Sequence, residues 1–67
     1  MKVNLRMSVM SQLSDIQFLV EVDEKEKVRN LANYCKAVLI KYDNLDEYVE
    51  SEELDNLYKE VVERFKK

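Results

Sequence analysis

The sequence contains no glycine, no proline and no histidine, and it has a single cysteine, Cys35. Without glycine and proline the chain lacks the residues that form the commonest hairpin turns and phosphate-binding loops, which argues against an all-β or α/β fold. Without histidine, neither a Ser–His nor a Cys–His nucleophile pair can form, and a tetrahedral zinc site has no ligand set. We therefore expect no catalytic residue, no metal and no cofactor, and a protein that is not an enzyme.

Length and hydrophobicity set further limits. The 67 residues allow one domain. A chain of this size buries only about 60% of its unfolded surface and usually needs a disulfide, a metal or a partner subunit for stability. One cysteine cannot form an internal disulfide, so we expect a homodimer. No apolar run approaches the roughly 20 residues of a membrane span, and the N-terminus lacks the apolar core of a signal peptide. Together with the single cysteine, this indicates a cytoplasmic protein that does not contact a membrane.

Two segments carry the apolar periodicity of amphipathic helices. A helix is expected over residues 52–66, with one apolar stripe of Leu54, Leu57, Tyr58, Val61, Val62 and Phe65. A second helix is expected over residues 24–42, with a stripe of Val28, Leu31, Ala32, Cys35, Val38, Leu39 and Tyr42. Ser51 and Asp23 are suitable N-caps for these two helices. In the connection between them, residues 46–49 are expected to form one helical turn.

The first segment is apolar on two sides. As a helix over residues 5–22, its main stripe is Leu5, Val9, Leu13, Ile16 and Val20, and the opposite stripe is Val3, Met7, Phe18 and Val22. A helix with two apolar sides must be covered on both, so we expect Met7, Phe18 and Val22 to contact a second subunit. Residues 2–9 also alternate as a strand would, and the sequence leaves this choice open. The predicted fold is all-α: residues 1–67 form one helical domain, a small antiparallel three-helix bundle that dimerises.

Acidic residues concentrate before the third helix. Residues 1–42 carry seven bases and five acids, whereas residues 43–67 carry four bases and nine acids. Between Asp43 and Asp55 there are seven acids and no base. Such a segment can contact a basic cleft of a partner protein, and we predict an acidic partner surface of Asp43, Asp46, Glu47, Glu50, Glu52 and Glu53. The plainer interpretation is that these acids favour the helix dipole and solubility.

The stretch VNLRMS, Val3 to Ser8, resembles the strand of ribbon-helix-helix repressors, in which alternating polar residues enter the major groove. The resemblance covers about six residues. It implies that Lys2, Asn4 and Arg6 would face DNA, with Val3, Leu5 and Met7 inward. The third helix would then be an acidic arm, as in antitoxins that bind DNA with one end and a toxin with the other. The glycine that this family usually has between its two helices is missing here, where the link reads DEKEK. The acidic net charge of −3 also disfavours binding to nucleic acid.

The functional prediction is therefore a small non-enzymatic regulator or inhibitor that binds a larger protein with a basic or apolar surface. Tyr34 lies at the edge of its stripe and Ile40 lies outside it, and tyrosine is enriched at interfaces. The predicted interface consists of Met7, Phe18, Val22, Tyr34 and Ile40. The abundance of Lys, Asn and Tyr beside few Ala and Arg suits an AT-rich genome, which suggests a phage- or plasmid-borne protein. The alternative function is a ribbon-helix-helix repressor or antitoxin.

Overall fold

Three helices account for most of the chain in the computed structural model, which describes residues 1–65. Helix α1 spans Leu5–Glu21, α2 spans Lys25–Lys41 and α3 spans Ser51–Arg64. All three predicted helices are confirmed, with α1 and α2 ending within one residue of the expected bounds. Residue 66, the predicted end of the third helix, lies outside the described residues.

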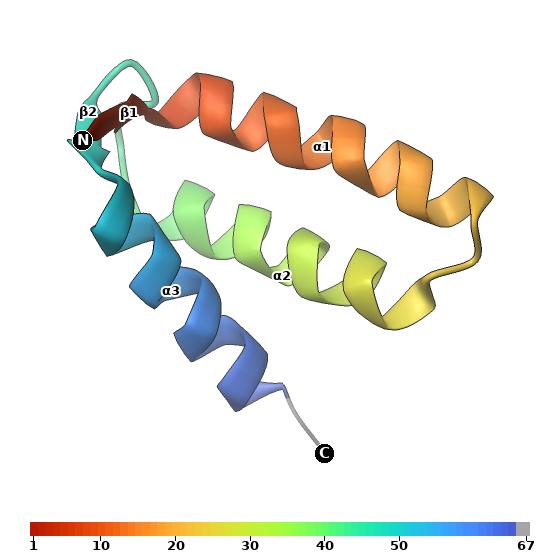
Figure 1. The fold of residues 1–67 in the computed structure, drawn as a ribbon. Coiled ribbons are helices and arrows are strands. Elements are labelled where there is room, and N and C mark those ends of the chain that lie inside the picture. Colours follow the sequence, from red (N-terminus) through yellow and green to blue (C-terminus); the bar gives the residue numbers. More distant parts are fainter. Residues whose placement is uncertain (66–67) are drawn as a thin grey trace.

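Helix α2 is the central helix of the arrangement. Figure 1 shows α1 and α2 side by side as a hairpin, with α3 crossing at an angle on the other side of α2. Packing between α1 and α2 is the most extensive in the fold, and α3 packs chiefly on α2. Because α3 diverges from the hairpin, it does not cover the end of α1 that lies next to the α1–α2 turn.

A small sheet holds the other end of the molecule: residues 2–4 adopt the strand that the alternation over residues 2–9 left open, and the second strand was not expected. Strand β1, Lys2–Asn4, pairs antiparallel with β2, Tyr48–Glu50, and Val3 lies opposite Val49. The expected helical turn at residues 46–49 is therefore wrong. The longer strand of the ribbon-helix-helix alternative is also wrong beyond Asn4, because the chain is helical from Leu5 and β1 pairs within its own chain.

The helix ends use different residues from those predicted. Asp23 does not cap α2: its φ is 61°, and it follows the C-cap of α1. The Asp23 N–H donates to the Val20 carbonyl at 3.1 Å and the Glu24 N–H donates to the Leu19 carbonyl at 2.9 Å. This is the Schellman motif, whose left-handed position usually holds glycine. Ser51 is the first residue of α3 instead of its cap, and Glu50 occupies the cap position without a side-chain bond.

The core lies at the sheet end, where all five elements meet. Its buried residues are Leu5, Val9, Tyr34, Cys35, Val38, Val49, Leu54, Leu57 and Val61, with Leu5 and Val38 the most deeply buried. The apolar stripes continue beyond this core. Leu13 and Val20 of α1 and Leu39 of α2, all predicted to be core residues, are exposed over half or more of their surface, as is Phe65 after α3. Their stripes are longer than the contact area that the crossing helices share.

Candidate protein-binding surfaces

Five of the six residues of the predicted acidic surface have side chains that take no part in the hydrogen bonds between their segment and α1. The surface comprises Asp43, Asp46, Glu47, Glu50, Glu52 and Glu53, and every one of these side chains is exposed. They come from the loop after α2, from β2 and from the first turn of α3. Among the described residues, only two of the six form ion pairs: Asp46 with Arg6, and Glu50 with the Met1 amino group, both at 3.0 Å. Four carboxylates therefore remain available to a basic partner.

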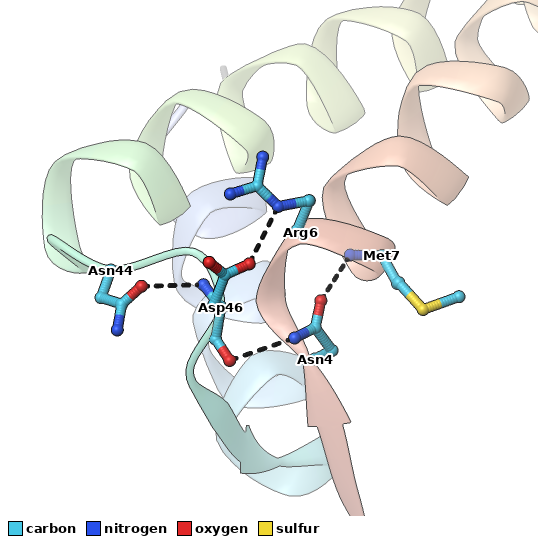
Figure 2. Close-up of polar contacts among 5 residues, drawn as sticks. All are labelled: Asn4, Arg6, Met7, Asn44 and Asp46. Atoms are coloured by element: carbon cyan, nitrogen blue, oxygen red, sulfur yellow. Dashed lines mark hydrogen bonds and ion pairs between the residues drawn. The ribbon is translucent and has the colours of Figure 1, made fainter.

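The exception is Asp46, which fastens its loop to the start of α1 (Figure 2). The Arg6 Nε donates to Asp46 Oδ1, and the Asn4 Nδ2 donates to the Asp46 carbonyl at 3.2 Å. The Asp46 N–H in turn donates to Asn44 Oδ1 at 3.0 Å. Asp46 is therefore part of an internal network, and its charge is already compensated.

The same loop satisfies backbone groups that a helix start leaves unpaired. The N–H groups of Leu5 and Arg6 donate to the carbonyls of Glu47 and Leu45, at 3.1 and 2.8 Å. The Met7 N–H donates to Asn4 Oδ1 at 3.1 Å, so Asn4 is the N-cap of α1. These bonds hold the acidic loop at a defined place on the scaffold. They also engage Asn4 and Arg6, two of the three residues that the ribbon-helix-helix alternative would present to DNA.

Two carboxylates of the acidic surface lie close to Tyr42, at the end of α2. Burial raises the pKa of Tyr42, and the negative charges of Glu53 and Glu47 raise it further. The Tyr42 hydroxyl is buried and has no hydrogen-bond partner within the described part of the chain. The loop and the start of α3 thus each place one carboxylate near the phenol of Tyr42, which is partly buried.

A second candidate surface is the exposed side of α1. Its apolar side chains are between 50% and 71% exposed, and we call this set the α1 apolar face: Met7, Met10, Leu13, Phe18, Val20 and Val22. The exposed positions of Met7, Phe18 and Val22 agree with the predicted opposite stripe. Met10, Leu13 and Val20 were missed as surface residues. The scarcity of charge in this segment could have identified them. Asp15 is the only charged residue between Met7 and Val20, so the side of this helix that faces solvent has to carry apolar side chains.

The two predicted interface residues of α2 have different surroundings. Tyr34 is only 3% exposed, so its predicted place at the edge of the stripe is wrong. Its ring packs on Tyr58 of α3, and burial raises its pKa. Ile40 is 80% exposed. It borders a shallow hollow between α2 and α3 with Leu57 and Val61, away from α1. The five predicted interface residues therefore do not form one surface.

The described residues offer little for other chemistry. No group of three or more Cys, Asp or Glu side chains in residues 1–65 is placed to hold a metal ion. Cys35 is buried, and burial raises the pKa of its thiol, which disfavours the reactive thiolate. Over the same range, no helix has both the length and the apolar character to cross a membrane.

Comparisons with known proteins do not assign this chain to a family. No protein-family model matches it, and no curated protein and no solved structure is significantly similar to it.

Proposed function

We propose that this protein is a small non-enzymatic regulator or inhibitor that binds a basic surface of a larger protein through its acidic surface. The observation that carries the proposal is the set of four exposed carboxylates without an ion pair in the described chain, Asp43, Glu47, Glu52 and Glu53, at one end of the fold. The protein acts as a homodimer in the cytoplasm, as its size and its single cysteine suggest. Its AT-rich amino-acid usage suits a phage or plasmid origin.

The placement of these carboxylates supports binding. Asp43 and Glu47 lie in a loop that is held on α1 by backbone bonds of 2.8 and 3.1 Å, and Glu52 and Glu53 lie in α3, so little backbone freedom is lost on association. Complementary charge raises the association rate and excludes partners of the wrong sign. Nucleic acid, which is itself anionic, is not a partner of this surface.

Affinity capture with the full chain tests the proposal. The bait is compared with a variant that carries Glu47→Gln, Glu52→Gln and Glu53→Gln, and each protein retained only by the parent is purified and titrated calorimetrically. Removing three charges should weaken binding by roughly tenfold or more at low salt, and less at high salt because of screening. The matched control is Glu60→Gln with Glu63→Gln, two acids near the other end of α3.

The control variant should bind like the parent. A partner that binds the triple variant as tightly as the parent, or an affinity that does not depend on salt, would contradict a role for the acidic surface.

A further inference from the structure

The α1 apolar face differs from the other surfaces of the molecule because it carries almost no charge. In α1 the stretch from Met7 to Val20 contains only Asp15. By contrast, α2 carries six charged side chains and α3 carries seven, against three in α1. Two copies of α1 can therefore approach each other without repulsion, whereas copies of the acidic surface repel one another.

The chain also exposes more surface than a protein of its size usually does. Its accessible area is 5250 Å², against about 4,450 Å² for a typical monomer of this mass. Its radius of gyration is 11.9 Å, against about 10.9 Å for a compact domain of this length. The excess of several hundred Å² is comparable to the roughly 800 Å² that each partner buries in a standard interface.

The order of side chains along α1 is suited to pairing with a second copy. Met7 and Phe18 are eleven residues apart, which is about three helical turns, so both lie on the same side. Between them on that side are two small residues, Ser11 and Ser14. The large side chains thus stand at the two ends of the stripe and the small ones in the middle.

We propose that two copies of this chain dimerise through α1, with the two helices antiparallel and related by a two-fold axis. With the axis between residues 12 and 13, Met7 of each copy lies opposite Phe18 of the other, and Ser11 lies opposite Ser14. The serines allow the helices to cross at the usual distance of about 8–10 Å, and each Met7 sulfur reaches an aromatic ring, a favourable contact. Met10 and Val22 border the seam, with Met10 of each copy opposite Asp15 of the other, whereas Leu13 and Val20 lie on a side of α1 that faces away from it.

Charge favours the antiparallel arrangement over the parallel one. A parallel pair would bring the two acidic surfaces side by side. The antiparallel pair separates them by about the length of α1, roughly 25 Å for its 17 residues, which is well beyond the Debye length of about 8–10 Å. Each acidic surface then lies nearer to the α1–α2 turn of the other copy, where four acids are partly balanced by Lys25 and Lys27.

Sedimentation of two oppositely charged variants, alone and mixed, tests this dimer. The inference deepens the proposed homodimer and does not depend on the larger partner, so its outcome is separate from the capture experiment. Met7→Glu and Phe18→Lys should each weaken dimerisation by roughly 30-fold or more, because each buries a charge opposite an apolar side chain. An equimolar mixture of the two variants should dimerise again through a Glu–Lys pair. Ile40→Glu, at a more exposed position away from α1, is the control and should leave the dimer intact.

Disulfide trapping reports the register without relying on a charged variant. Under oxidation, a mixture of Met7→Cys and Phe18→Cys chains should form mixed dimers, whereas either variant alone should not, since equal positions lie roughly 16 Å apart along the seam. A parent chain that sediments as a monomer, a dimer that tolerates both charged variants, or crosslinks between equal positions would overturn the proposal. Far-UV circular dichroism shows whether each variant is folded. If a charged variant is unfolded, the disulfide trapping experiment tests the dimer in its place.

Discussion

The rings of Tyr34 and Tyr58 meet edge to face, with their centroids 5.6 Å apart and their planes at 71°. This contact joins α2 to α3 at the core. Edge-to-face pairs are worth about 0.5–1.5 kcal/mol beyond the area that they bury. Tyr58→Leu, which keeps an apolar side chain, should therefore lower the free energy of unfolding by about 1 kcal/mol in urea titrations. Tyr48→Leu changes a tyrosine that is exposed and should have a smaller effect; equal losses would show that the ring contact is not what matters.

Asn4 should matter more than Arg6 for the stability of the α1 start. Asn4→Ala removes the N-cap bond to Met7 and should cost about 1 kcal/mol in the free energy of unfolding. Arg6→Ala removes an ion pair whose side chains are 56% and 71% exposed, which is worth at most about 0.5 kcal/mol after solvent screening. Urea denaturation of both variants measures the difference. Asn4→Ser keeps an acceptor for the Met7 N–H and loses only the donor to the Asp46 carbonyl, so it should lose less stability than Asn4→Ala, and an equal loss in the two variants would argue against capping.

Replacing Asp23 should stabilise the protein. Its φ of 61° is unfavourable for any residue with a Cβ, and its negative charge lies at the negative end of the α1 dipole. Asp23→Gly should raise the free energy of unfolding by about 0.5–1 kcal/mol, which is a rise in melting temperature of roughly 4 °C for a small domain. The neighbouring Glu24 has a φ of −90°. Glu24→Gly should therefore lower the free energy of unfolding. If both variants change the free energy of unfolding in the same direction, the left-handed backbone at Asp23 is not the cause.

The protein should lose stability in alkaline solution. Burial raises the pKa of Tyr42, Tyr34 and Cys35 above their ordinary values, because the folded state disfavours their anions. The stabilising contribution of each group is complete below its unfolded pKa, roughly 8.5 for cysteine and 10 for tyrosine. It is lost as the pH rises from there through the folded pKa. Urea titrations at pH 7 and above pH 10 should show this decline.

Tyr42→Phe separates one part of this effect. At pH 7 the variant should be as stable as the parent or slightly more stable, because the hydroxyl that it removes is buried and has no hydrogen-bond partner among residues 1–65. Above pH 10 it should lose less stability than the parent. A variant that is clearly less stable at pH 7 would show that the hydroxyl does form a hydrogen bond in solution.

Part of the candidate site could be predicted from the sequence, and part could not. The exposed positions of Met7, Phe18 and Ile40 follow from their places off the main stripes. The burial of Tyr34 does not, because it depends on the angle at which α3 crosses α2. The ion pair between Asp46 and Arg6 could not be predicted either, because Arg6 lies forty residues earlier in the chain.

Local rules were sufficient for the helices. Apolar periodicity and the charges near the helix ends depend on neighbours within a few residues, so the sequence by itself determined all three helices and the neutral character of α1. Only the tertiary structure decided the pairing of Lys2–Asn4 with Tyr48–Glu50, the left-handed conformation of Asp23, and the limit of the core. The physical reason is that these features depend on contacts between distant segments. An apolar stripe shows which side chains favour burial, whereas the crossing of the helices determines which of them are covered within one chain.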